Sequence, residues 1–192
     1  MIALIEQNMH HENAHTDYAI WLHNLHANYV HTDNLEAAAE VIRKMQQAAA
    51  LAPARLRTDI RLIRYNAEIF FRLKQQQYMA IKKLHGAYVS DLPLTLVKNN
   101  PNAQVWLLHQ FTFATAFFMT GDYKNCIRLL FVMDNQNKWE IGQKIILESF
   151  ALKALAHWER DQPEQAGNMV KRYFALEQDS GNAVVSPTQL VM

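Results

Sequence analysis

The amino-acid sequence predicts an all-α protein, arranged as a stack of about four antiparallel helical hairpins. Only 5 glycines and 5 prolines occur in 192 residues, so turns are few and elements are long, which favours helices over many short strands. Hydrophobic residues make up 50% and charged residues 19%, a composition typical of a packed globular chain. Apolar residues also recur at helical spacing on both sides of four short polar turns. We therefore expect one domain over residues 1–180 and a C-terminal tail, residues 181–192, that is disordered or docked.

The first hairpin is expected between residues 14 and 49. An apolar helical stripe covers residues 14–29, and a second covers residues 35–49, where abundant alanine favours a helix. Between them, the residues His-Thr-Asp-Asn at 31–34 supply a cap for the second helix. Pro53 follows the expected end of that helix, as is common just beyond a helical C-terminus.

The second hairpin is expected between residues 54 and 91. Its first helix, residues 54–73, is apolar on two faces and must therefore be covered on two sides. A polar break at residues 74–77 separates it from a helix that ends near Asp91. A loop or short helical turn then leads to Pro101, which can begin the next helix because the first helical turn needs no N–H donor.

The third and fourth hairpins are expected at residues 102–134 and 139–180. In the third, the helical pattern stops at Thr120-Gly121-Asp122 and resumes directly afterwards. In the fourth, Asp161-Gln162-Pro163 separates a long helix from a last helix whose outer face is polar, as in the end cap of a helical stack.

The four turns align as an internal repeat. Offsets of 43, 45 and 40 residues separate the last members of the turn sequences, which are Asp33-Asn34-Leu35, Gln76-Gln77-Tyr78, Gly121-Asp122-Tyr123 and Asp161-Gln162-Pro163. Three residues further on, each unit places one residue against the preceding helix, where space is short; these are Ala38, Ile81, Cys126 and Ala166. Cys126 is accordingly expected to be a buried small residue, because a reactive thiol needs an electropositive neighbourhood.

Residues 102–180 resemble tetratricopeptide repeats. In the third unit the resemblance rests on Gly121-Asp122-Tyr123 and Cys126, and in the fourth on Ala154, Pro163 and Ala166. The first hundred residues share only the helix-hairpin pattern. Similarity to this family implies a right-handed stack of helix pairs whose first helices line a concave surface that commonly holds a peptide or a partner protein.

The resemblance implies a non-catalytic scaffold or adaptor that binds a protein or peptide and needs no cofactor. Its register places these residues on the concave surface: His23, Ala27, His31, Asn66, Phe70, Lys74, Phe111, Thr115, Ala151, Leu155 and Glu159. The set of lysines and asparagines with which family members clamp a peptide carboxyl terminus is not present as a set. A sensor that holds a small ligand or peptide between helices is an alternative of another class.

A zinc-dependent hydrolase is a further alternative, because His11-Glu12-Asn13-Ala14-His15 matches the motif HExxH. On a helix this spacing lets two imidazoles bind zinc while the glutamate serves as general base. No sheet precedes the motif to form a substrate cleft, and six of the nine histidines lie within the first 31 residues, where chance matches are easier. A solvated histidine face, or one that senses pH or binds a metal adventitiously, is the competing interpretation.

Three arginines, Arg57, Arg61 and Arg64, share one helix face and could bind an acidic peptide or the phosphate backbone of a nucleic acid. Asp59 and Glu68 on the same helix favour a solvated or internally paired face instead. The net charge of +1 gives no overall attraction to nucleic acid or to an anionic membrane.

A cytoplasmic location is the expectation from targeting signals and cysteine usage. The single cysteine excludes an intramolecular disulfide and suits a reducing compartment. The N-terminus lacks the basic region of a secretory signal, and the longest apolar run, residues 111–119, is shorter than a membrane span. The apolar segment at residues 1–12 could pack on its own chain or on a second copy, so a homodimer stays open.

Overall fold

The protein is all-α over residues 14–93, 103–134 and 143–179, the parts that the computed structural model describes. Its helices are α2 (Ala14–His31), α3 (Leu35–Leu51), α4 (Arg57–Lys74), α5 (Tyr78–Asp91), α7 (Ala103–Met119), α8 (Tyr123–Asp134), α9 (Gln143–Trp158) and α10 (Pro163–Asp179). No strand occurs in these parts of the chain, so the prediction of an all-α protein is confirmed. The N-terminal segment and the tail at residues 181–192 lie outside the described residues.

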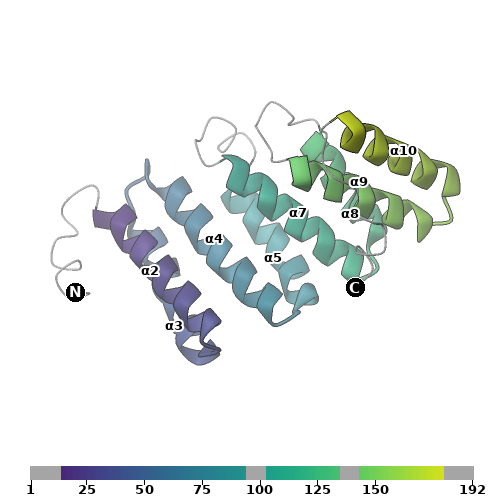
Figure 1. The fold of residues 1–192 in the computed structure, drawn as a ribbon. Helices are drawn as coiled ribbons and strands as arrows, with labels where there is room; N and C mark the ends of the chain where they lie inside the picture. The colour runs from purple at the N-terminus through teal and green to yellow at the C-terminus, as the bar shows by residue number, and fades with distance from the viewer. Residues whose placement is uncertain (1–13, 94–102, 135–142, 180–192) are drawn as a thin grey trace.

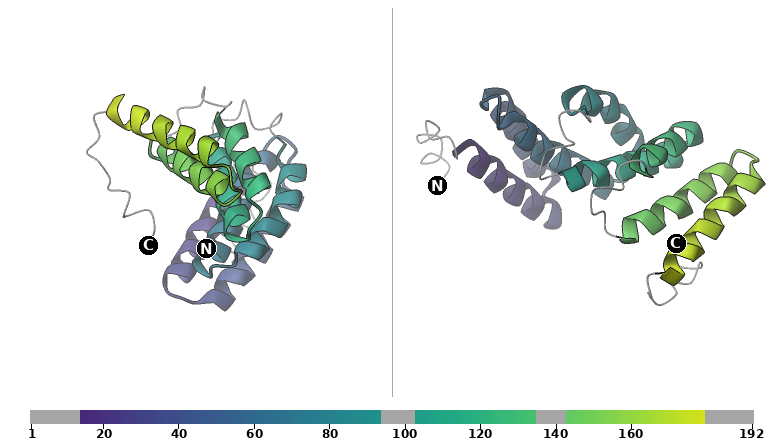
Figure 2. Two further views of the ribbon diagram at one scale, coloured as in Figure 1. Left: turned by 90° about the vertical axis from the view of Figure 1, so that its right-hand side faces the viewer. Right: turned by 90° about the horizontal axis from the view of Figure 1, so that it is seen from above.

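The helices pack as successive antiparallel pairs. The pair α2–α3 lies at one end of the molecule and the pair α9–α10 at the other, with α4–α5 and α7–α8 between them (Figure 1). Within the series, α2 contacts α4, α4 contacts α7, and α7 contacts α9, while the second helix of each pair contacts the first helix of the next. The view from above in Figure 2 gives the same order. The first helices of the four pairs therefore form one continuous row.

Four turns with the same backbone geometry join the two helices of each pair. Their first residues have positive φ, with values of 55° at Asp33, 54° at Gln76, 75° at Gly121 and 54° at Asp161. In every case the following N–H donates to a carbonyl five residues earlier, as from Asn34 to Tyr29 at 2.8 Å. This is the Schellman arrangement that ends helices with one left-handed residue. The predicted alignment of the four turns is thus confirmed in the backbone.

One prediction of a helix boundary was wrong. The helix expected from residue 54 begins at Arg57, because residues 54–56 form a turn in which the N–H groups of Leu56 and Arg57 both donate to the Pro53 carbonyl. The turn delays the start of α4 by three residues, and the arginines in the first half of α4 lie beside the end of α3.

The main core lies between α4, α5, α7 and α8. Its fully buried side chains include Tyr88, Phe113 and Leu130, and Cys126 fits among them with no exposed surface. The other residues expected in tight places after each turn, Ala38, Ile81 and Ala166, are buried as well. Two smaller clusters join α2, α3 and α4. Burial of this apolar surface is the main favourable term that holds successive pairs together.

Candidate functional site

A cavity of about 310 Å³ opens on the row of first helices. We call it the groove, and define it by the residues that line it: Thr16, Ile20 and His23 from α2, Asp59, Leu62, Ile63 and Asn66 from α4, and Val105 from α7. Within α2 the positions are spaced by four and three residues, and in α4 the adjacent pair Leu62 and Ile63 lies three residues from both Asp59 and Asn66, so each helix presents one face to the groove. Aliphatic side chains form much of its wall, and polar groups lie between them.

His23 and Asn66 were predicted on the partner-binding surface, and both line the groove. Burial lowers the pKa of the His23 imidazole, so this side chain is neutral at pH 7. The Oδ1 atom of Asn66 lies 3.1 Å from Nε2 of His109, a side chain buried in α7. The amide Nδ2 of Asn66 has no hydrogen bond to any other described residue and is available as a donor at the groove.

Three further predicted residues lie towards the other end of the same helices and do not line the groove. His31 is exposed at the end of α2, and Phe70 is 47% exposed on α4. Lys74 forms an ion pair with Asp33 at 3.5 Å, across the turn between α2 and α3. The pair is largely exposed and contributes little to stability. These side chains remain accessible for a partner that extends beyond the groove.

The predicted residues of α7 and α9 are not brought to the groove either. Phe111 is half-buried against the main core, and the Thr115 hydroxyl donates to the Phe111 carbonyl. Leu155 is exposed on α9, and Glu159 follows the end of that helix, where it accepts a 3.4 Å hydrogen bond from the Tyr123 hydroxyl.

Six groove residues were missed by the sequence analysis: Thr16, Ile20, Asp59, Leu62, Ile63 and Val105. The signal was present, because Thr16 and Ile20 lie seven and three residues before His23 on the same helical face. The predicted register followed that face only toward the C-terminal ends of the helices, whereas the groove lies along their N-terminal halves.

The zinc motif is only partly within the described residues. His15 lies in the first turn of α2, whereas His11 and Glu12 lie outside the described parts of the chain. Among the residues that the structure describes, no group of three histidine, cysteine or acidic side chains could hold a metal ion. His26 is instead fully buried, with its ring 6.0 Å from that of Phe71 in an edge-on arrangement.

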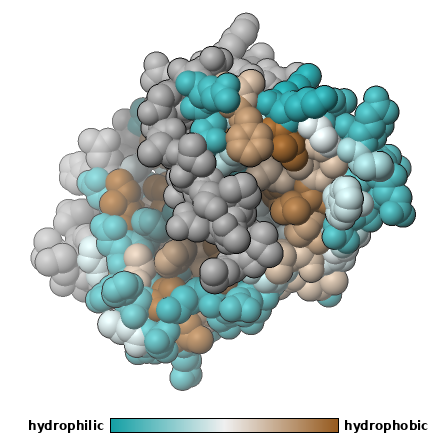
Figure 3. Space-filling view, turned by 45° about the vertical axis from the view of Figure 1, so that its right-hand side comes forward, coloured by the Kyte–Doolittle hydropathy of each residue, from teal (hydrophilic) through white to brown (hydrophobic). Residues whose placement is uncertain are grey.

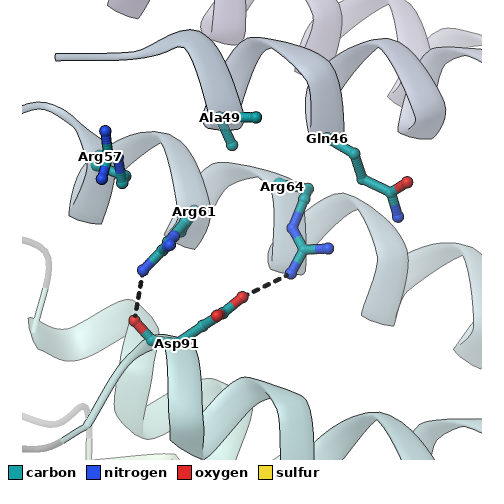
Figure 4. A pocket seen from close by; sticks show the side chains of 7 residues that line it. Gln46, Ala49, Arg57, Arg61, Arg64 and Asp91 are labelled. Carbon is teal, nitrogen blue, oxygen red and sulfur yellow. Dashed lines mark hydrogen bonds and ion pairs between the residues drawn. The ribbon is translucent and has the colours of Figure 1, made fainter. Parts of the chain in front are cut away.

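The predicted arginine face lines a second cavity, of about 260 Å³, between α3, α4 and α5. We call it the arginine cavity, and define it by Gln46, Ala49, Ala50, Arg57, Arg61, Arg64 and Asp91. Arg61 and Arg64 point toward Asp91 at the end of α5 (Figure 4). Arg61 donates to the Asp91 main-chain carbonyl at 3.1 Å, and Arg64 lies 3.6 Å from the Asp91 carboxylate. The structure therefore brings the three predicted arginines into one site.

Carboxylates neutralise only part of this positive charge. Glu68 pairs with Arg64 at 3.7 Å and with Arg72 at 2.9 Å, and Asp91 also accepts a 2.8 Å hydrogen bond from Tyr65. Burial, together with this hydrogen bond, raises the pKa of Tyr65 to about 12, so its hydroxyl stays protonated as the donor. The predicted internal pairing thus holds for Arg64 but leaves the other two arginines of the cavity without a carboxylate partner among the described residues.

Apolar surface is also exposed on the last hairpin, where Trp158 is 65% exposed and Leu155, Val170 and Phe174 are about two-fifths exposed. On the face shown in Figure 3, apolar groups lie interspersed with hydrophilic ones where the residues are coloured. None of the described helices is long and apolar enough to cross a lipid bilayer. Comparisons of the chain with protein-family models, with curated proteins and with solved structures found no match.

Proposed function

We propose that the chain is a non-catalytic module that binds a protein or peptide, and that its hairpins form a right-handed, tetratricopeptide-like stack. The observation that carries the proposal is the groove, because its walls come from the first helices of three successive hairpins, α2, α4 and α7. A surface built from successive repeats suits an extended segment that contacts one repeat after another.

The chemistry of the groove supports a peptide ligand. Ile20, Ile63 and Val105 offer apolar surface to a side chain, while the Asn66 amide can donate to a main-chain carbonyl. A volume of about 310 Å³ is at the lower limit for small-molecule pockets, which favours one or two anchoring side chains over a large cofactor. The neutral imidazole of His23 adds a polar group without the cost of burying a charge.

The test compares two substitutions that place the same charge on exposed apolar positions. Ile20→Glu puts a carboxylate in the groove, and Met79→Glu puts one on α5, outside the groove; the two side chains are 46% and 53% exposed. Wild type and both variants are immobilised, and the proteins captured from native extract are quantified by mass spectrometry. The strongest captured protein is then purified and its affinity for each form is measured.

We expect Ile20→Glu to weaken binding of the purified partner by at least tenfold, because a buried carboxylate without a partner costs more than about 1.4 kcal/mol. Met79→Glu should bind as the wild type does. Equal affinity of the two variants for every captured protein would contradict the groove as the binding surface.

A further inference from the structure

We propose that the arginine cavity is a second binding site, and that it takes a phosphate monoester dianion. This goes beyond the proposed peptide-binding function, because the arginine cavity and the groove lie on opposite sides of α4. Arg57, Arg61 and Arg64 recur at spacings of four and three residues and so share one face of α4. The groove residue Asn66 follows Arg61 by five residues, which places it about 140° away around the helix axis.

Charge favours a dianion in the arginine cavity. The cluster holds four guanidinium groups, and of these only Arg64 and Arg72 form ion pairs with the two carboxylates of Glu68 and Asp91. Arg57 and Arg61 donate instead to the main-chain carbonyls of Ala52 and Asp91, at 3.2 and 3.1 Å. A neutral carbonyl accepts a hydrogen bond without cancelling the charge of the donor, so two positive charges remain in this cluster.

Unused hydrogen-bond donors accompany the unused charge. The Nε atom of Arg57 is buried and has no hydrogen-bond partner among the described residues. A buried donor without a partner is costly, so an acceptor that entered the cavity beside this N–H would satisfy it. Arg61 engages one of its terminal nitrogens with Asp91, and its remaining N–H groups are free to form the two-point contact that guanidinium makes with oxyanions.

The arginines are held in place before any ligand binds. The Arg64 guanidinium stacks 3.6 Å from the centre of the Tyr65 ring, and the carboxylate of Asp91 accepts from the Tyr65 hydroxyl. Asp91 in turn holds Arg61 through its main-chain carbonyl. Because these side chains are already ordered, a ligand pays less conformational entropy on binding.

Size and lining set the class of ligand. The volume of about 260 Å³ is below the usual range for drug-sized molecules, and among the described residues that line the cavity only Ala49 and Ala50 are apolar. The cavity therefore recognises a small charged group rather than an apolar body. Phosphate offers several acceptor oxygens and a charge near −2 at neutral pH, which matches the two unpaired arginines. The group can be a free phosphate compound or a phosphorylated side chain, since both present the same atoms.

The test is an NMR titration of the full ¹⁵N-labelled chain with inorganic phosphate at constant ionic strength, observing the arginine Nε–Hε signals. We expect saturable shifts of the Arg57 and Arg61 signals. Arg57→Lys keeps the charge but removes the planar donor pair, and should weaken phosphate binding about tenfold or more. Arg43→Lys is the matched control, because Arg43 is an exposed arginine on α3 that pairs with Glu40; it should leave the affinity unchanged.

Two further probes complete the test. Tighter binding of N-acetylphosphoserine amide than of phosphate identifies a phosphorylated side chain as the source, and equal binding identifies a free phosphate compound. Shifts that do not saturate in the wild-type protein, equal losses in the two variants, or binding of succinate as tight as that of phosphate would each overturn the proposal. The wild-type titration decides the matter even if a variant does not fold, and none of these results depends on the groove.

Discussion

Asn66 in the groove is hydrogen-bonded to His109 in the core, with 3.1 Å between Oδ1 and Nε2. On its other side the imidazole places Nδ1 3.1 Å from the Tyr88 hydroxyl, which is fully buried. An asparagine oxygen can only accept, so Nε2 carries the proton and Nδ1 accepts from Tyr88. The two hydrogen bonds that link Tyr88 to His109 and His109 to Asn66 thus fix the orientation of the Asn66 amide and turn its Nδ2 group away from the core.

His109 should therefore remain neutral, with the proton on Nε2, from pH 8 down to about pH 5. Burial lowers its pKa to about 3, because charging an imidazole inside the core removes it from water. Long-range ¹H–¹⁵N spectra distinguish the two tautomers and the protonated ring. A ring that becomes doubly protonated near pH 6 would contradict the hydrogen-bond directions given above.

Asn66→Leu should destabilise the protein by about 1–3 kcal/mol, because it leaves the buried Nε2–H of His109 without an acceptor. Asn24→Leu is the matched control, since Asn24 is an exposed residue on α2; we expect it to change stability by less than about 0.5 kcal/mol. Urea denaturation of both variants measures the difference. Equal stabilities would show that Asn66 and His109 are not coupled.

Two glycine substitutions should have opposite signs. A Cβ atom added at Gly86 or Gly121 meets nothing within 4 Å, so neither change is opposed by a clash. Gly86 lies inside α5, where alanine should stabilise the protein by roughly 0.5–1 kcal/mol. Gly121 has φ of 75°, which costs an L-residue about 1–2 kcal/mol, so Gly121→Ala should destabilise it. Thermal or urea unfolding of the two variants checks this, and a loss of stability in both would contradict it.

The helices and their turns could be predicted from the sequence because their causes are local. Apolar spacing marks each helical face, and polar residues mark each turn even where, as at Gln76, no glycine is present. The backbone at Gln76 is nevertheless left-handed, because the packing of α4 against α5 imposes the same turn on a residue that rarely adopts it. The repeat could thus be recognised, although the individual φ angles could not.

The sites could be predicted only in part. The arginine face was visible as a helical spacing, but Asp91, which holds Arg61 and Arg64, lies on the next helix and about thirty residues along the chain. The groove depends in the same way on how Val105 of α7 closes one end of the face shared by α2 and α4. Such contacts arise from the relative placement of helices, on which residue spacing within one helix carries no information.

Cys126 should not react with thiol reagents while the protein is folded. The side chain has no exposed surface, and burial, together with the charge of Asp122, raises the pKa of its thiol to about 12. The thiolate is the reactive form, so its population at pH 8 is very small. Addition of Ellman's reagent should release no thiolate chromophore in buffer and one equivalent in denaturant. Rapid release in buffer would show that the third hairpin opens readily.

Acid should destabilise the protein, and His26 should be one cause. Burial, assisted by the charge of nearby His23, lowers the pKa of His26 to about 4, whereas the unfolded chain has a value near 6.5. Between these values the unfolded state binds a proton that the folded state excludes, so the stability is fully present above pH 6.5 and falls as the pH decreases toward 4. The slope for one such imidazole approaches about 1.4 kcal/mol per pH unit.

His26→Leu should remove this contribution. Both ring nitrogens of His26 are buried without hydrogen-bond partners among the described residues, so leucine should be tolerated at pH 7.5 and should stabilise the protein by up to about 1 kcal/mol. Urea unfolding from pH 7.5 to 4.5 measures the slope, which should be smaller in His26→Leu than in the wild type. His31→Gln is the control, because His31 is exposed at the end of the same helix and should leave the slope unchanged. If the stabilities of the wild type and His26→Leu fell in parallel with decreasing pH, the prediction would be contradicted, because His26 would then have to gain a proton in the folded state. The buried ring beside Phe71 has no hydrogen-bond acceptor among the described residues that could stabilise such a proton.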